Sequence, residues 1–148
     1  NGATSIWERW NGWTKEDGPG DVNMNSYSHY AYGAVVEWMF DTIAGIDHRG
    51  SGFQHFTLRP QPGGSLKHAT ATYRSPYGTI RSAWRKRGKQ MRYEVTIPAN
   101  TQATVMLPVK ELAAVKLDGK SLQAQGIAVT ADSSFELAAG EYVMTWRG

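Results

Sequence analysis

The sequence predicts a mainly β fold: an antiparallel β-sandwich or jelly roll, preceded by a loop and one long helix. Two observations support this. From Phe53 onward, short stretches rich in β-branched and aromatic residues alternate with turn-forming residues. Before that point, an apolar stretch of helical length follows a loop rich in Gly, Pro and Asp. We therefore expect a first region at residues 1–46, a linker at residues 47–52 and a β-domain at residues 53–148.

The first region begins with a short extended segment, Thr4–Trp10, in which Ile6 is the expected buried anchor. A loop follows at residues 11–25. Asn25 or Ser26 is a suitable N-cap for a helix that continues to Ala44, where Gly45 provides a left-handed stop. Apolar residues occupy most of the circumference of this helix, a pattern typical of a helix that is buried on most sides. A single β-domain covers only one face, so the helix is expected to have neighbours outside this chain.

Strands are expected in the β-domain wherever period-two alternation lies between turn signals such as Asn100-Thr101 and Ala139-Gly140. In the clearest case the side chains of Met91, Tyr93, Val95 and Ile97 should point inward. Two tryptophans, Trp84 and Trp146, also occupy inward positions. The expected strands are residues 53–59, 66–73, 79–86, 90–98, 101–107, 114–117, 127–130, 134–137 and 141–146.

Composition narrows the class of protein. With 148 residues, 41% hydrophobic and 20% charged, the chain has the makeup of an ordinary folded domain rather than a disordered one. The net charge of +3 does not by itself imply a nucleic-acid partner. The longest apolar run, Ala31–Phe40, contains Glu37 and is too short to span a bilayer. Because Asn1–Ala3 is neither an initiator methionine nor a signal segment, we expect a piece of a longer polypeptide.

The strongest chemical pattern is a carboxylate among tryptophans. Glu8 lies between Trp7 and Trp10, and Trp13 follows closely. Such a carboxylate can position a water for attack on a sugar carbon, and indoles provide flat apolar surfaces for the C–H faces of a pyranose. The alternative is an ordinary surface glutamate beside core tryptophans. Spacing alone favours the ordinary glutamate, because catalytic carboxylates are a minority of carboxylates.

Histidines give no metal site. For His29, near the start of the expected helix, the residues alone favour a buried structural histidine. The alternative is a hydrogen-bond partner for a sugar hydroxyl, with Gly33 leaving space beside it. The others, His48, His55 and His68, are scattered, and the sequence contains no cysteine. We expect no metal and no cofactor.

A basic run with interleaved aromatics lies at residues 81–92. It is compatible with a nucleic-acid surface. It also coincides with a predicted hairpin, whose outward positions should be charged and whose cationic edge discourages aggregation. The second interpretation is favoured, and no nucleic-acid or membrane partner is expected.

Two segments resemble a known family. The residues Trp7-Glu8-Arg9-Trp10 and the stretch Asn25–Val35 resemble the end of the catalytic domain of bacterial α-L-rhamnosidases, glycoside hydrolase family 78. The segment Gly52–Gly64 and the tetrapeptide Ser75–Gly78 resemble the junction into that family's C-terminal β-domain. The resemblance covers essentially the whole chain, and its first half is the more specific.

The resemblance implies the C-terminal portion of an (α/α)6-barrel enzyme that hydrolyses terminal α-L-rhamnosyl bonds with inversion, acting on L-rhamnose-containing glycosides. Under it Glu8 corresponds to the general base and His29 to a residue of the rhamnose subsite, with Trp7, Trp10 and Trp13 as walls around the sugar. The family's general acid lies upstream and is absent here, so the chain alone should be inactive without the remainder of the catalytic domain. The alternatives for residues 53–148 are a carbohydrate-binding module or a purely structural domain.

Overall fold

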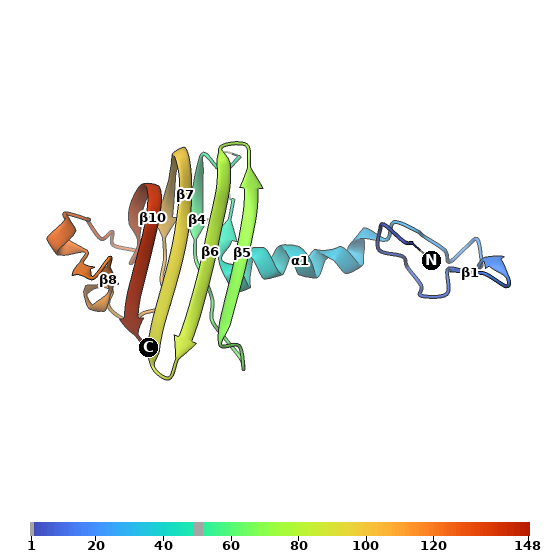
Figure 1. Ribbon diagram of the computed structural model, residues 1–148, viewed down its shortest axis with the longest axis horizontal. Coiled ribbons are helices and arrows are strands. Elements are labelled where there is room, and N and C mark those ends of the chain that lie inside the picture. The colour runs from blue at the N-terminus through green and yellow to red at the C-terminus, as the bar shows by residue number, and fades with distance from the viewer. Residues whose placement is uncertain (1, 49–51) are drawn as a thin grey trace. The chain divides into compact units, whose positions relative to one another are not determined.

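The computed structural model describes residues 2–48 and 52–148 of the chain. Within this part the chain forms two compact units, which divide between Trp38 and Met39. Figure 1 shows the first unit, with the tryptophan-rich segment, in blue, and the sheet of the second unit in green to red.

The first unit is organised by the pairing of two segments that are distant in sequence. The Glu8 amide donates to the Ser26 carbonyl (2.8 Å), and the His29 amide donates to the Ile6 carbonyl (2.8 Å). Residues 26–29, which bend at Tyr27 and Ser28, are therefore held against residues 6–8. The side chain of Ile6 is about half exposed, so the prediction of a buried anchor at this position was wrong.

The loop between these segments is closed by hydrogen bonds to one carbonyl. The Gly12 carbonyl accepts from the Gly20 amide (2.7 Å), the Asn25 Nδ2 group (2.8 Å) and the Tyr27 hydroxyl (2.9 Å). Inside the loop, β1 (Trp13–Thr14) and β2 (Gly18–Pro19) form a short antiparallel hairpin.

The helical stretch begins at Tyr30, and the prediction of a start at Ser26 was wrong. It consists of a 3-10 turn η1 (Tyr30–Gly33), the α-helix α1 (Ala34–Trp38) and a π-helical segment η2 (Met39–Ala44), which lies in the second unit. Ser26 cannot begin the helix because its amide and its carbonyl both bond to Glu8. The apolar side chains of Val35, Val36 and Trp38 are about half exposed, although the sequence pattern predicts burial on most sides of the helix.

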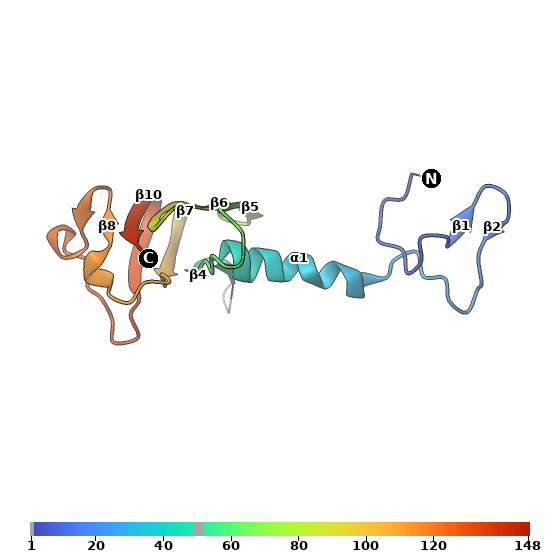
Figure 2. The same ribbon diagram turned by 90° about the horizontal axis from the view of Figure 1, so that it is seen from below.

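In the described part of the second unit, β7 (Gln90–Val105) is the longest strand and pairs with three others. Its first half pairs antiparallel with β6 (Gly78–Arg87), which pairs with β5 (His68–Ser75). Its second half pairs in parallel with β4 (His55–Leu58), which pairs with β3 (Ile46–Asp47). Figures 1 and 2 show β4 behind the layer of β5 and β6, so the two halves of β7 belong to two layers.

The remaining strand of full length, β10 (Phe135–Arg147), runs antiparallel along both halves of β7. On its other side it pairs with β8 (Lys116–Leu117), which pairs with β9 (Lys120–Ser121). Two 3-10 turns, η3 (Leu112–Ala114) and η4 (Gln123–Gln125), flank these short strands. The mainly β fold class is confirmed, with the β4–β7 pair as a parallel exception.

Several strand boundaries differ from the predictions. Strands expected to end at turns near Asn100 and Gly140 instead continue, because these residues occupy irregular positions inside β7 and β10. Residues 127–130 form no strand, since the Thr130 amide donates to the Ser134 carbonyl in a local turn (2.9 Å). Asp47, expected in the linker, lies in β3, and residues 49–51 of that linker fall outside the described part of the chain.

The core lies between the two layers of the second unit, and η2 covers part of it. The predicted inward residues Met91, Tyr93, Val95 and Ile97 are all buried, as are Trp84 and Trp146. The Trp84 indole nitrogen donates to the Ile43 carbonyl (2.8 Å), and the Ser82 hydroxyl donates to the Ala44 carbonyl (2.5 Å). Side chains of β6 therefore satisfy carbonyls at the end of η2, which would otherwise lack donors.

Replacing Gly45 by alanine should destabilise the second unit by about 2 kcal/mol or more, because its φ of +79° is unfavourable for other residues and a Cβ atom would lie 2.1 Å from the Pro60 nitrogen. Urea unfolding monitored by circular dichroism measures this loss. The control is Gly88→Ala at φ +57°, where no atom lies within 4 Å of the added carbon. We expect about 1–2 kcal/mol there. Equal losses in both variants would contradict the steric explanation.

Tyr93 should make stability depend on alkaline pH. Burial raises the pKa of its phenol above the ordinary range, and the hydrogen bond with Ser82 offsets part of this. Above about pH 10 the unfolded chain therefore binds fewer protons than the folded one, and stability falls as pH rises. We expect this group to cost up to about 1.4 kcal/mol per pH unit there, and Tyr93→Phe to lack that component. Urea unfolding at about pH 9 and about pH 11 checks this. An equal fall in the free energy of unfolding between these pH values in the unmodified chain and in Tyr93→Phe would refute it.

Candidate functional site

The carboxylate of Glu8 is held in place by the paired segments of the first unit. Its Oε2 atom accepts a hydrogen bond from the Ser26 amide (3.0 Å) and lies 3.9 Å from Nδ1 of His29. The Glu8 side chain is 21% exposed and the His29 side chain 34% exposed. The carboxylate thus has a fixed orientation and remains accessible to solvent.

A hollow of about 710 Å³ lies beside this carboxylate. Trp7, Glu8 and Trp10 contribute to its lining, and Trp10 is fully exposed. The Trp7 ring is braced edge-on by Tyr27, with the ring centroids 5.1 Å apart. The other lining residues are Ala3, Ser5, Ile6, Arg9 and Tyr32. An accessible carboxylate at the edge of an indole-lined hollow can position a water or a hydroxyl next to an apolar sugar face.

Most of the predicted site residues lie close together. Trp7, Glu8 and Trp10 line the same hollow, and His29 contacts the carboxylate from the paired segment. Trp13 lies instead in β1, opposite Pro19, and does not line this hollow.

Tyr32 was missed by the sequence analysis. It lines the hollow, and its ring centroid lies 5.1 Å from that of His29. The available signal was its position three residues after His29, which places both side chains on one side of a helical turn.

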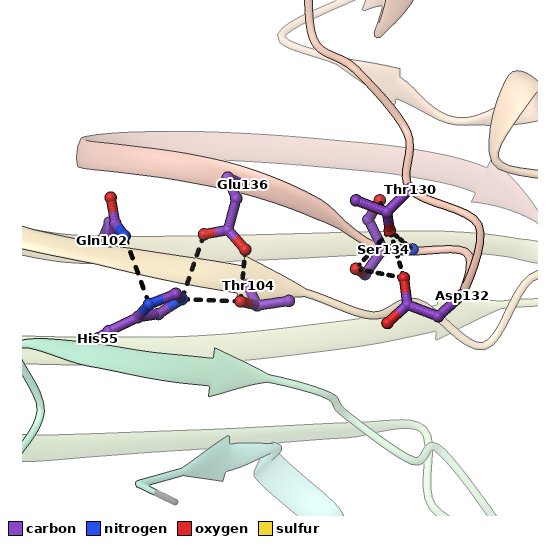
Figure 3. Close-up of polar contacts among 7 residues, drawn as sticks. All are labelled: His55, Gln102, Thr104, Thr130, Asp132, Ser134 and Glu136. Atoms are coloured by element: carbon purple, nitrogen blue, oxygen red, sulfur yellow. Dashed lines mark hydrogen bonds and ion pairs between the residues drawn. The ribbon is translucent and has the colours of Figure 1, made fainter. Parts of the chain in front are cut away.

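A second polar cluster was also missed, and it lies on the strands β4, β7 and β10 (Figure 3). His55 Nε2 donates to the Thr104 hydroxyl oxygen (2.8 Å), which in turn donates to Glu136 (2.5 Å). The Gln102 amide donates to His55 Nδ1 (3.3 Å). The cluster therefore joins three neighbouring strands by side-chain contacts, and the threonine proton is already donated to a carboxylate. It resembles a cross-strand stabilising network more than a catalytic site.

Figure 3 also shows a turn that is closed by side chains. The hydroxyls of Thr130 and Ser134 donate hydrogen bonds to Asp132. The bond from Thr130 has the larger effect, and both hold the pKa of the Asp132 carboxyl below its ordinary value. The turn replaces the strand that was expected at residues 127–130.

Neither a metal site nor a membrane helix is found among the described residues. No group of three or more His, Asp or Glu side chains is arranged to hold a metal ion in residues 2–48 and 52–148. No helix in that part of the chain has both the length and the apolarity needed to cross a bilayer.

Comparison with known proteins decides the family. Residues 45–121 match the family model of the bacterial α-L-rhamnosidase C-terminal domain, and residues 1–43 match that of the bacterial α-L-rhamnosidase 6 hairpin glycosidase domain. The chain belongs to the bacterial α-L-rhamnosidase family. The resemblance given by the Trp7–Trp10 motif and by the junction after Gly52 is confirmed, as is the assignment to the C-terminal portion of such a protein.

Individual α-L-rhamnosidases support this. One from Formosa agariphila is 39% identical over 120 residues, which are 81% of this chain and 13% of the relative. The crystal structure of the Streptomyces avermitilis α-L-rhamnosidase complexed with L-rhamnose is 32% identical, with a TM-score of 0.74 over 98% of this chain and 14% of the other. The α-L-rhamnosidase structure from Dictyoglumus thermophilum, with a TM-score of 0.73 over 99% of this chain and 16% of the other, is 24% identical and supports the fold alone. The chain therefore spans about one seventh of the length of these α-L-rhamnosidases.

Proposed function

We propose that the chain is part of an inverting α-L-rhamnosidase, in which Glu8 is the general base. The observation that carries the proposal is the Glu8 carboxylate, oriented by the Ser26 amide and His29 at the edge of a hollow lined by Trp7 and Trp10. The relatives are named as α-L-rhamnosidases, and the Streptomyces avermitilis structure is described as a complex with L-rhamnose. The proposed substrates are accordingly glycosides with a terminal α-L-rhamnosyl group.

The proposed roles follow from inverting hydrolysis. One carboxylic acid protonates the leaving oxygen, while a carboxylate about 6.5–9.5 Å away removes a proton from a water on the opposite face of the sugar. Glu8 takes the second role. The Ser26 hydrogen bond and His29 keep its oxygen in position, so little reorganisation is needed when the water loses its proton.

The tryptophans are proposed to bind the sugar. Rhamnose carries a methyl group in place of a hydroxymethyl group, and the indoles of Trp7 and Trp10 offer it an apolar surface. We propose that His29 hydrogen-bonds a sugar hydroxyl and that Trp13 contributes to the wall once the other helices of the catalytic domain are in place.

The domain organisation is part of the same proposal: residues 1–46 end the catalytic domain, residues 47–52 form the linker, and residues 53–148 form the C-terminal β-domain, except that Ile46 and Asp47 pair with the sheet of the β-domain through β3. A structural role for that domain is favoured by the bonds from Ser82 and Trp84 to the last carbonyls of η2. Trp84 and Trp146 are buried, so neither provides the exposed platform of an aromatic carbohydrate-binding module.

The chain by itself should not hydrolyse an aryl α-L-rhamnoside, because the general acid is proposed to lie in the remainder of the catalytic domain. Release of p-nitrophenol from p-nitrophenyl α-L-rhamnoside is expected to equal the buffer background. The Glu8→Gln chain is the matched control for trace contamination. Turnover well above background that disappears in Glu8→Gln would show that the chain carries its own acid, and it would contradict the division of roles.

A further inference from the structure

A second hollow, of about 480 Å³, lies on the outer face of the sheet formed by β5, β6 and β7. The inner face of the same strands carries Ser82, Trp84 and Tyr93, which are buried. Alternation along β6 turns Arg81, Ala83 and Arg85 to the opposite side. In Figures 1 and 2 no other strand or helix of the described second unit covers this outer face.

The hollow concentrates positive charge. Four arginines and one carboxylate line it, a net charge of +3, which equals the net charge of the entire chain. The other residues of the chain therefore carry no net charge together, and the chain's excess positive charge lies on this face. The lining arginines are Arg81, Arg85, Arg87 and Arg92, and the carboxylate is that of Glu94.

The register of the strands places positive charges of this cluster opposite each other, which destabilises the sheet. Arg85 on β6 lies directly opposite Arg92 on β7, and His68 on β5 lies directly opposite Arg85. Like charges in directly opposed positions destabilise a sheet. The Glu94 carboxylate pairs with Arg92, whereas the charge of Arg85 has no such partner in the described part of the chain, and a bound anion would supply one.

The floor and walls suit an anion. Ala83 stands between Arg81 and Arg85 on the same face of β6, and its small side chain leaves the space that the arginines surround. Glu94 accepts hydrogen bonds from Arg92 Nε (2.7 Å) and Arg81 (3.3 Å), which fix these two guanidinium groups. The hydrogen bond from Arg92, and to a smaller extent the one from Arg81, lowers the pKa of Glu94. Within the described part of the chain, the side chains of Arg85 and Arg87 form no ion pair or hydrogen bond.

The cationic surface continues along the sheet. A neighbouring hollow of about 460 Å³ shares Arg87 and Gln90 and is also lined by Lys89 and Arg147. Two adjoining hollows fit an extended ligand with repeated anionic groups better than a single small anion. No tryptophan or tyrosine is exposed in either hollow to stack on a nucleic-acid base, because Trp84 and Tyr93 point into the core.

We propose that this outer face of the β-domain binds an acidic glycan, through carboxylate or sulfate groups held by Arg81, Arg85, Arg87 and Arg92. Guanidinium groups bind such oxyanions through paired hydrogen bonds. The inference rests on the proposed function only in choosing a glycan among polyanions. It does not depend on Glu8 or on turnover.

The test is a calorimetric titration of the 148-residue chain with four probes: an oligogalacturonate, a sulfated heparin oligosaccharide, neutral maltohexaose and duplex DNA. Saturable binding of at least one acidic saccharide is expected, with no saturable binding of maltohexaose and weaker binding of DNA. The dissociation constant should rise about tenfold or more in the double variant Arg85→Gln, Arg92→Gln. It should also rise with salt between about 50 mM and about 300 mM.

The matched control removes two exposed cations outside the hollow, Lys110→Gln and Lys120→Gln, with the same change in net charge. It should change the dissociation constant by less than about twofold. The melting temperature of the single variant Arg85→Gln should equal or exceed that of the unmodified chain, since one of two opposed like charges is removed while the Arg92–Glu94 ion pair is kept. Failure to bind either acidic saccharide, tighter binding of DNA or maltohexaose, an equal loss in the control variant, or a lower melting temperature of Arg85→Gln would overturn the proposal.

Because the measurement needs no catalysis, its failure leaves the assignment of Glu8 intact. Conversely, an acidic glycan bound here by a chain whose Glu8 proves irrelevant to catalysis would still support the site on the sheet.

Discussion

Replacing Glu8 by glutamine is expected to lower kcat of the complete enzyme for an aryl α-L-rhamnoside by about 10²–10⁴-fold. Glutamine retains an oxygen that can accept the Ser26 amide hydrogen bond, measured at 3.0 Å to Glu8, but it cannot take a proton from water. The base acts in the transition state, so KM should change much less than kcat. Steady-state kinetics measure both.

Glu16→Gln is the matched control, because it makes the same chemical change at an exposed position of the loop. Its kcat should remain that of the unmodified enzyme. If Glu8→Gln lost less than about tenfold in kcat, or if both variants lost equally, Glu8 would not be the base.

Trp84→Ala is expected to reduce the free energy of unfolding of the second unit by about 3–5 kcal/mol. The indole is 2% exposed, in the core between the layers, and its nitrogen donates to the Ile43 carbonyl at 2.8 Å. Truncation therefore leaves a large cavity and a carbonyl without its donor at the end of η2. Urea unfolding followed by far-ultraviolet circular dichroism measures the loss.

Trp10→Ala provides the comparison, since the same side chain is removed where it is fully exposed. We expect a change of less than about 0.5 kcal/mol. A loss below about 1 kcal/mol for Trp84→Ala would mean that the core does not depend on the contact between β6 and η2.

Some of the β-domain could be predicted because the decisive signal is local. Met91, Tyr93, Val95 and Ile97 alternate with polar residues, and one buried face requires that pattern. The ends of the strands could not be predicted in the same way. Asn100 (φ +61°) and Gly140 (φ +155°) are turn-forming residues, yet both lie inside continuous strands. Residues with positive φ suit bulges as well as turns, and pairing with distant strands decides between them.

The helix start illustrates the same limit. Ser26 is a good N-cap by residue type. Its backbone is paired instead with Glu8, a contact across 18 positions that no local pattern reveals. The long-range pairing therefore moves the start of the helix to Tyr30.

The site could be predicted only in part from the sequence, because some of its residues are neighbours in the chain and others are not. Trp7, Glu8 and Trp10 are neighbours in the chain, so their grouping needs no tertiary information. His29 and Tyr32 reach the site only through the pairing of residues 6–8 with residues 26–29. Residue type and position drew attention to His29, and the family resemblance then gave it a role in the site, whereas Tyr32 was not singled out by either.

The most direct test of the central claim is chemical rescue of Glu8→Ala in the complete enzyme by azide. If Glu8 activates the attacking water, its removal leaves space for a small anion that needs no base. We predict that azide restores turnover of p-nitrophenyl α-L-rhamnoside and that nuclear magnetic resonance identifies the product as β-L-rhamnosyl azide, with the anomeric configuration inverted. Absence of rescue, or an α-configured azide product, would contradict the assignment of Glu8 as the base of an inverting reaction.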